Sequence, residues 1–299
     1  MVHFKPTEDA LIISSARPDG SKAVFSRLHA FQRVDTDAPM VSIKYVLQGF
    51  ENYRVNQHTH RVQSGEFLLV NQSQSLEIDF ASQQAVLGLC LYVNERVVND
   101  VYRNMSSTDG CLLDNPFAPS QRAFDFYESV YSIHDDAMGA FLQHLARQTN
   151  LQTGEILVDK DELYYQTAER LLQSQLRIAC AIRRISAQQV STRNELFRRV
   201  NLAKRMMDAD LQADWSVPEL ASEVALSEFH FFRSFKQAFG LSPRQYLIQK
   251  RLERAACLLK AKRYTVSEIA FLTGFSDVFA FSKAFKKTYR SAPSAYSVE

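Results

Sequence analysis

The sequence predicts an α+β protein: an antiparallel β-barrel with helices, followed by an all-α domain of two similar helical units joined by a linker helix. Three observations carry this prediction. The chain of 299 residues is longer than a typical single domain with one hydrophobic core. The apolar pattern changes from period two to a helical period near Asn94, and the last third contains an internal repeat. We expect one domain at 1–190, with its barrel at about 20–95 and its helices at about 96–190, and a second domain at 191–299.

The composition is that of an ordinary globular protein, with 46% hydrophobic and 23% charged residues. No apolar run reaches the ~18 residues that a membrane helix needs, and residues 1–10 lack the continuous apolar region of a secretory signal. The cysteines form no CxxC pair, which favours reduced thiols over disulfides or zinc. We therefore expect a cytoplasmic protein without a membrane partner. The four cysteines are Cys90, Cys111, Cys180 and Cys257.

The predicted barrel rests on short runs of alternating apolar and polar residues, separated by glycines and by Asn/Ser clusters. This pattern is typical of a small antiparallel barrel or sandwich. The expected strands are 41–47, 52–55, 67–70, 76–80 and 85–93.

The pattern after Asn94 predicts helices at 122–130, 139–148 and 161–187, followed by a Gln-, Ser- and Thr-rich linker at 185–194. Apolar residues of the long helix recur at spacings of three and four. Such a stripe either packs against its own domain or pairs with a second copy, and we expect a homodimer through 161–187. The stripe consists of Tyr164, Ala168, Leu171, Leu172, Leu176, Ala179 and Ile182.

The charge is distributed unevenly along the chain. Residues 191–299 hold 18 Lys and Arg against 11 Asp and Glu, a net charge of +7, whereas residues 1–190 hold 17 against 22, a net charge of −5. A basic last third favours a polyanionic partner for that part of the chain.

The internal repeat begins with two capping boxes, Ser216-Val-Pro-Glu219 and Thr265-Val-Ser-Glu268, 49 residues apart. In such a box the hydroxyl accepts from the backbone N–H three residues on, and the glutamate reaches back. Each box opens a short helix. We expect these helices to end at a small residue, Ala225 in one copy and Gly274 in the other.

A second helix follows each short one, with Ser227 and Ser276 as the expected N-caps. Two short helices joined by a tight turn form a helix-turn-helix, and here the unit occurs twice, joined by a helix at 243–260. A helical bundle with a chance duplication is the alternative. It does not explain why both second helices carry basic residues on the face opposite their phenylalanines, Arg233 and Lys236 in one and Lys283, Lys286, Lys287 and Arg290 in the other. The matching residues are Phe231, Phe235, Lys236 and Phe239 with Phe281, Phe285, Lys286 and Tyr289, then Pro243 and Tyr246 with Pro293 and Tyr296.

Several segments now carry a family resemblance. Residues 227–243, Arg251-Leu-Glu-Arg-Ala-Ala, Ile269-Ala-x-x-x-Gly-Phe-Ser-Asp and Phe281-Ser-Lys-x-Phe-Lys-Lys resemble the AraC/XylS family of bacterial regulators over 193–296. Ser291 stands where the family usually has Gly, and Ser297 where it usually has Arg. The resemblance implies a DNA-binding transcription regulator with a cupin-like sensory or dimerisation domain at 1–190. Its implied partners are double-stranded DNA, an unidentified small-molecule effector and RNA polymerase.

The resemblance also implies that the two second helices enter adjacent segments of major groove. Arg233 is the strongest candidate, because a guanidinium can bond both acceptors of a guanine. The phenylalanines among the candidates have partial burial against neighbouring aromatic rings as their alternative role. The base-contact candidates are Phe229, Phe232, Arg233, Val278, Phe279, Ala280 and Lys283. The phosphate-contact candidates are Ser227, His230, Lys236, Ser276, Lys286, Lys287 and Arg290.

A metal-dependent cupin enzyme is the alternative function, because His58-Thr-His60 and Glu66 resemble the ligands of metal-binding cupins. The histidines lie between Asn56-Gln57 and Ser64-Gly65, which predicts an exposed hairpin turn, and the spacing to Glu66 is longer than in those cupins. The chain has no P-loop, GxGxxG, HExxH or nucleophile elbow. We therefore expect no enzyme activity, no metal and no cofactor.

Overall fold

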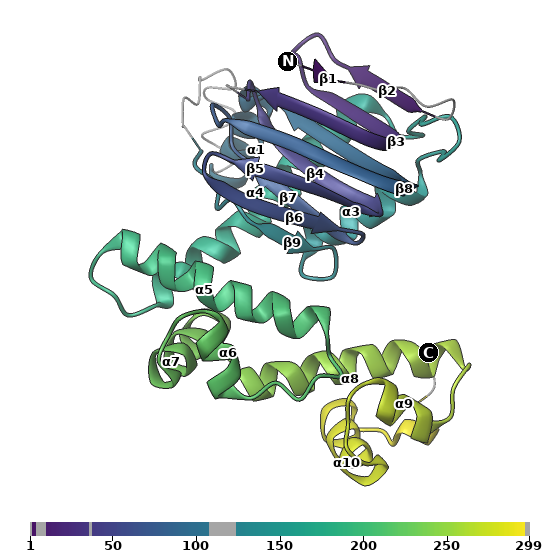
Figure 1. Ribbon diagram of the computed structural model, residues 1–299, viewed down its shortest axis with the longest axis vertical. Coiled ribbons are helices and arrows are strands. Elements are labelled where there is room, and N and C mark those ends of the chain that lie inside the picture. Colours follow the sequence, from purple (N-terminus) through teal and green to yellow (C-terminus); the bar gives the residue numbers. More distant parts are fainter. Residues whose placement is uncertain (1, 4–9, 36–37, 108–123, 297–299) are drawn as a thin grey trace. The chain divides into compact units, whose positions relative to one another are not determined.

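The computed structural model describes residues 2–3, 10–35, 38–107 and 124–296, and the chain divides into two compact units, Met1–Ile178 and Ala179–Glu299. The first unit is an antiparallel sheet with helices, and the second is helical (Figure 1). The predicted fold class is confirmed. Its strands are β1 (Val2–His3), β2 (Leu11–Ala16), β3 (Lys22–Asp35), β4 (Val41–Gln48), β5 (Phe50–Val55), β6 (His58–Gln63), β7 (Glu66–Val70), β8 (Leu76–Val93) and β9 (Val130–Ser132).

The long strand β8 organises the sheet. Its first part pairs with β5 and its second part with β4, while β3 runs beside both, with a bulge between Leu28 and Ala30. The strands predicted separately at 76–80 and 85–93 form one long strand, β8, whose ladder with β3 is interrupted between Ala81 and Val86. The strand order is β1-β3-β8-β4-β7-β9, with β2 paired to β3 and β6 paired to β5.

The helices α1 (Glu95–Ser106), α3 (Ala137–Arg147) and α4 (Lys160–Arg184) cover one face of this sheet (Figure 1). Alternate residues of β4 and β8, such as Ile43 and Leu89, join this helix-covered core together with Leu142 and Tyr164. Residues on the opposite side of the strands, Val46 among them, form a second core with β5, β6 and β7. Residues 41–46 of β4 are therefore all buried.

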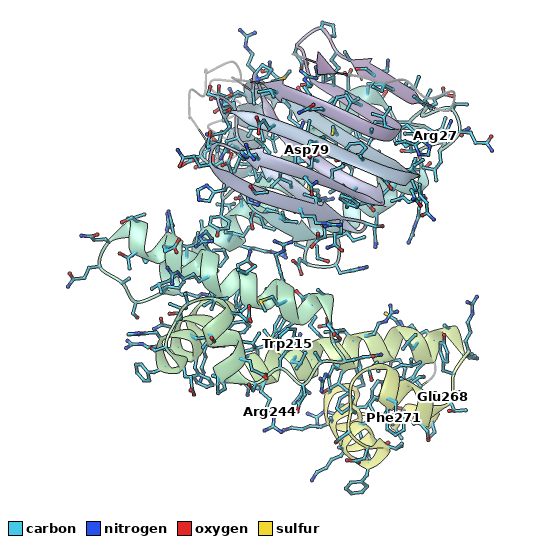
Figure 2. All side chains as sticks on the ribbon, in the orientation of Figure 1. Arg27, Asp79, Trp215, Arg244, Glu268 and Phe271 are labelled. Atoms are coloured by element: carbon cyan, nitrogen blue, oxygen red, sulfur yellow. The ribbon has the colours of Figure 1, made fainter. Side chains whose placement is uncertain are left out.

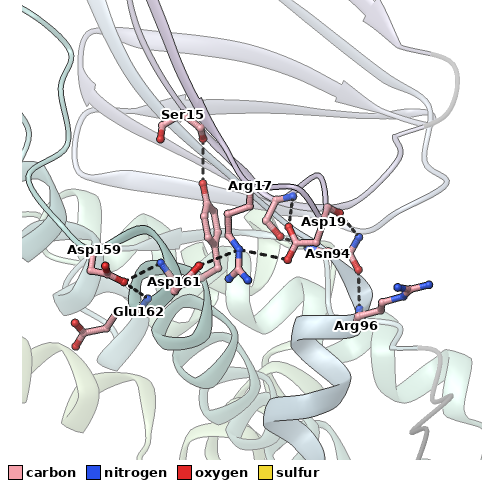
Figure 3. A network of polar contacts seen from close by, with 10 residues as sticks. Ser15, Arg17, Asp19, Asn94, Arg96, Asp159, Asp161 and Glu162 are labelled. Carbon is pink, nitrogen blue, oxygen red and sulfur yellow. Dashed lines mark hydrogen bonds and ion pairs between the residues drawn. The ribbon is translucent and has the colours of Figure 1, made fainter.

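A polar network fastens the hairpin between β2 and β3 to the helices (Figure 3). The Arg17 guanidinium lies 3.3 Å from the Asp161 carboxylate at the start of α4, and the Tyr164 hydroxyl donates to the Ser15 carbonyl at 3.1 Å. Asn94, the N-cap of α1, donates to the Asp19 carbonyl at 2.7 Å. The network joins the starts of two helices to one turn.

The helix predicted at 122–130 is wrong where it can be compared. Residues 122–123 lie outside the described residues, 124–129 have no regular structure, and Val130 begins β9. Contacts from distant parts of the chain take up the backbone amides. Phe126 N donates to Asn71 Oδ1 at 3.0 Å and Tyr127 N donates to Gln175 Oε1 at 2.8 Å.

The apolar stripe of α4 packs against its own unit. Tyr164, Ala168, Leu171 and Leu172 belong to the helix-covered core, whereas Leu176 is 51% exposed. The linker predicted at 185–194 is wrong in its second half, because the next helix begins at Val190. No helix in the described part of the chain is long and apolar enough to cross a membrane.

The second unit consists of helices, and all of them except the first helix and the final 3-10 helix begin at a side-chain cap. Ser216, Ser242 and Thr265 each form a capping box. The helices are α5 (Val190–Ala209), α6 (Val217–Glu223), α7 (Glu228–Phe239), α8 (Pro243–Ala261), α9 (Val266–Leu272), α10 (Val278–Tyr289) and a final 3-10 helix, Pro293–Ala295.

Candidate nucleic-acid interface

The predicted repeat is present in the structure as two helix-turn-helix units. We call α6 with α7 the first head and α9 with α10 the second head. In the first head Ser216 N donates to Glu219 Oε2 at 3.0 Å and Glu219 N donates to Ser216 Oγ at 3.3 Å. Thr265 and Glu268 do the same at 2.7 and 3.2 Å. Both predicted capping boxes are confirmed, and the backbone N–H bonds they receive lower the pKa of both glutamates.

The turn of each head lies at the expected small residue. Ala225 and Gly274 both adopt the left-handed conformation, with φ of +52° and +81°. Alanine tolerates this conformation less well than glycine does. At Gly274 the lack of a side chain is also a steric need, because a Cβ there would lie 2.5 Å from the Leu211 carbonyl oxygen.

The second helices begin with different caps. Ser227 is the N-cap of α7 and accepts from His230 N at 3.4 Å, as predicted. The prediction of Ser276 for α10 is wrong, because Asp277 is the N-cap and accepts from Ala280 N at 2.7 Å. The extra residue of the second head places a carboxylate at the positive end of the helix dipole, and this favours the later start.

The two heads have equivalent aromatic cores. Phe231 and Phe235 of α7 and Phe281 and Phe285 of α10 are 0% exposed. Phe235 meets the Tyr246 ring edge-on at 5.8 Å between centroids, and Phe285 meets the Tyr296 ring at 5.1 Å. The phenylalanine and tyrosine positions that match between the two repeats are therefore in contact, and these contacts hold each second helix against the segment that follows it.

The opposite face of α7 is exposed. Phe229 is 69% and Phe232 is 42% exposed, and Arg233 and Lys236 are exposed beside them. These positions follow one another by three, one and three residues, so they share one helix face. Phe229 is thus mostly open to solvent, whereas Phe232 is partly covered.

The outward face of α10 is also open, with Phe279 80% exposed, so partial burial is wrong for this residue. Ala280 and Lys283 are exposed, whereas Val278 is half-buried against the core of the second head. Three exposed cations, Lys286, Lys287 and Arg290, continue toward the helix end.

The cations of both outward faces have no carboxylate partner within ion-pair distance in the described part of the chain. This holds for Arg233 and Lys236, for the three lysines of α10 and for Arg290 after it, whereas Arg198 and Arg199 of α5 are paired with Glu195 at 2.8 and 2.7 Å. Unpaired surface cations are free to meet phosphates. On the first head, the Ser227 hydroxyl also lies 3.0 Å from His230 Nδ1.

The two second helices end differently. Gly240 ends α7 with φ of +77°, and Arg290 occupies the same left-handed position after α10 with φ of +59°. The expectation that Ser291 stands at the glycine position is therefore wrong, because the offset of 50 residues between the second helices brings Arg290 to this place. Ser297 lies outside the described residues.

A cleft of about 1070 Å³ separates the heads. Figure 2 labels three of its lining residues, Trp215 before α6, Arg244 on α8 and Phe271 on α9. Ser276 and Ala280 line the side that belongs to the second head. Arg244 is exposed at the capped N-terminus of α8, and sequence reasoning missed it because the residue lies outside the second helices.

Buried polar groups gather between the strands of the first unit, and sequence reasoning did not find them. Lys44 is 3% exposed and donates to the Tyr92 hydroxyl at 2.7 Å, and the Tyr53 hydroxyl donates to Glu51, which is also 3% exposed. Burial raises the pKa of Glu51 and raises the pKa of the Cys90 thiol to about 11. Alternation along β4 places Lys44 on the face opposite Ile43.

The candidate metal ligands do not form the predicted turn. His58 and His60 lie on β6, opposite Val55 and Tyr53 of β5. Glu66 begins β7 and accepts from Gln63 N at 2.9 Å. Among the described residues no three His, Cys, Asp or Glu side chains converge on a position where they could hold a metal ion.

Two family models match the chain. An AraC-like ligand binding domain matches residues 25–166, and a helix-turn-helix domain matches residues 220–298. The chain is 36% identical over 95 residues to the probable transcriptional regulator LumQ of Photobacterium leiognathi. It is 40% identical over 89 residues to the uncharacterized HTH-type transcriptional regulator YidL of Escherichia coli. These matches cover 32% and 30% of this chain but only 38% and 30% of the two relatives.

Solved structures give similar matches. The DNA-binding domain of AdpA, in complex with a target DNA, is 31% identical, with 34% of this chain and 88% of that chain covered and a TM-score of 0.30. ToxT from Vibrio cholerae is 12% identical, with 92% of this chain and 97% of that chain covered and a TM-score of 0.34. With an AraC-like ligand binding domain followed by a repeated helix-turn-helix, the chain belongs to the AraC/XylS family of regulators.

Proposed function

We propose that this protein is a transcription regulator that binds double-stranded DNA through α7 and α10, each in its own segment of major groove. One observation carries the proposal. Both second helices bury phenylalanines on one face and expose, on the other, cations that no carboxylate of the described residues neutralises. A helix of this kind can bring side chains to base edges while its flanking cations meet phosphates.

Base contacts are assigned by exposure and chemistry. Arg233 is the candidate for bidentate contact with a guanine, and Lys283 for a single contact of the same kind. The exposed rings of Phe229, Phe232 and Phe279 and the small exposed side chain of Ala280 suit thymine methyl groups. Half-buried Val278 is assigned by its apolar chemistry alone. The phosphate contacts are assigned to Ser227, His230, Lys236, Ser276, Lys286, Lys287 and Arg290. Asp277 caps α10, and the exposed Ser276 hydroxyl beside it donates to the Asp277 carboxylate at 3.3 Å.

Selection from a pool of random duplexes, followed by gel-shift titration of the enriched sequence, tests this proposal. We expect one sequence to be enriched and its affinity to fall with salt, and Lys286→Ala to reduce the log–log salt slope by about 0.9. Arg96→Ala removes an exposed cation of the first unit and serves as the matched control with an unchanged slope. Affinity that is equal for all duplexes, or independent of salt, would contradict the proposal.

The remaining roles are proposed for the first unit. We assign to it an unidentified small-molecule effector. We also propose a homodimer contact through 161–187, which begins in this unit and continues past its end. We place the protein in the cytoplasm, with RNA polymerase as a further partner. The match to an AraC-like ligand binding domain supports the effector, and the exposed Leu176 leaves part of the α4 stripe available to a second copy. Native mass spectrometry of the full chain tests both: we expect a dimer carrying a small molecule, and a bare monomer contradicts both roles.

A further inference from the structure

The loop between α5 and α6 contacts the second head although it leads into the first. Gln212 Nε2 of this loop donates to the Leu272 carbonyl at the end of α9 at 3.0 Å. The turn residue Gly274 lies against the same loop, so close to the Leu211 carbonyl that a Cβ could not fit. The segment that leads into the first head therefore supports the turn of the second.

Arg251, halfway along α8, holds this loop in place. Its Nε donates to the Leu211 carbonyl at 2.7 Å and its Nη2 donates to the Ala213 carbonyl at 2.9 Å. The guanidinium also faces Gly274, where a Cβ would lie 2.9 Å from its central carbon. The planar fork of arginine suits two carbonyls at once, which a lysine cannot reproduce. We call Leu211, Gln212, Ala213, Arg251, Leu272 and Gly274 the interhead clasp.

The clasp gives the two heads a second connection besides α8. Leu252 and Ala255 of α8 pack with Ile269 and Phe281 in the core of the second head. On the first-head side, the Tyr246 hydroxyl of α8 donates to Asp208 of α5 at 2.7 Å. If the second head packed on α8 alone, it could still rotate about the axis of this helix. Its contact with the loop between α5 and α6 opposes this rotation.

We propose that the interhead clasp sets the number of base pairs that the protein accepts between the two DNA segments read by α7 and α10. This proposal rests on the proposed function. One inserted base pair displaces one segment by about 3.4 Å and turns it by about 35° around the duplex axis. Two heads fixed to each other cannot follow that rotation, whereas heads joined by α8 alone can follow part of it.

The test compares spacing profiles. The duplex enriched by the wild-type protein is remade with one base pair deleted, and with one or two inserted, between the segments protected by the two heads. We expect the wild type to lose about 100-fold in affinity at each altered spacing, because a mismatched spacing removes the advantage of simultaneous binding. For Arg251→Ala we expect the loss to shrink to about tenfold or less, with a weaker complex at the native spacing.

Matched variants separate this role from general destabilisation. Arg254→Ala removes an exposed cation from the same helix outside the clasp, and it should keep the wild-type profile. Gln212→Ala removes only the bond to the Leu272 carbonyl and serves if Arg251→Ala fails to fold, while Arg251→Lys keeps the charge but not the fork. The proposal is supported if affinity depends less on spacing in the clasp variants and keeps its wild-type dependence in Arg254→Ala. Equal losses at every spacing overturn it, and a wild type that binds no duplex overturns the proposed function instead.

Discussion

The two heads share a backbone plan and differ in what they offer to DNA. On α7 the outward face carries one guanidinium, Arg233, beside two exposed phenylalanines. On α10 the corresponding face carries Lys283 with apolar neighbours, and three more cations follow toward the helix end. Since a guanidinium discriminates bases better than an ammonium does, and since cations near phosphates act on every sequence, we infer a division of labour. The first head supplies more of the specificity and the second more of the affinity.

The largest expected effect concerns the cores on which both faces depend. Phe231→Ala and Phe281→Ala each empty a fully buried ring position, which costs about 3–5 kcal/mol of stability. We expect hydrogen exchange to rise mainly in α6 and α7 for the first variant and mainly in α9 and α10 for the second, because each ring belongs to one head. Equal loss of protection in both heads for both variants would show that the heads unfold as one body.

A smaller effect tests the division of labour directly. Arg233→Ala should cost about 1–3 kcal/mol of binding free energy and relax selection for one guanine, because the bidentate contact is lost. Lys283→Ala should cost less and relax selection less. Lys236→Ala is the control on α7 and should weaken binding to all duplexes alike. Repeated selection with each variant measures both quantities, and stronger relaxation for Lys283→Ala than for Arg233→Ala would reverse the assignment.

The helix ends make the comparison sharper. Arg290 occupies a left-handed position that Gly240 occupies in the first head. We expect Arg290→Gly to raise the free energy of unfolding by about 1 kcal/mol, because glycine adopts this conformation without strain. The same substitution should lower the salt slope of DNA binding by about 0.9, since one phosphate contact is removed. Urea titration and salt-dependent gel shifts measure the two effects; an unchanged slope would place Arg290 outside the interface.

The smallest effect concerns a feature that supports only the first head. Arg199 of α5 donates to the Ala225 carbonyl at 2.6 Å while it pairs with Glu195. Hydrogen bonds from Arg198, followed by those from Arg199, lower the pKa of Glu195 to about 2. Because the folded-state pKa is lowered, this stabilisation is present above the unfolded value of about 4.3 and is lost as pH falls toward 2.

Solvent screens this half-exposed pair, so we expect Glu195→Gln to cost about 1 kcal/mol or less at pH 7. The difference between variant and wild type should shrink as pH falls from about 4.3 to about 2. Urea titrations at several pH values measure it. A difference that stays constant over this range would mean that the carboxylate charge does not contribute.

The features that the sequence alone determined are local or repeated. The capping boxes at Ser216 and Thr265 were readable because their partners lie three residues away. The cores of the heads were readable because the same spacing of phenylalanines occurs twice. The family resemblance added which helix faces to assign to DNA. In all these cases the residues that decide the structure lie within one or two helical turns of each other, or recur at a constant offset.

The tertiary structure decided whatever depends on residues distant in the sequence. Residues 124–130 avoid the helix because Asn71 and Gln175 take their amides, and the two halves of β8 lie in one sheet because both pair with the single strand β3. The exposure of Phe229 and Phe279 and the interhead clasp likewise depend on neighbours that no local pattern names. The physical reason is that backbone hydrogen bonds and burial are satisfied by whichever groups the fold brings near, and a sequence pattern records only nearby ones.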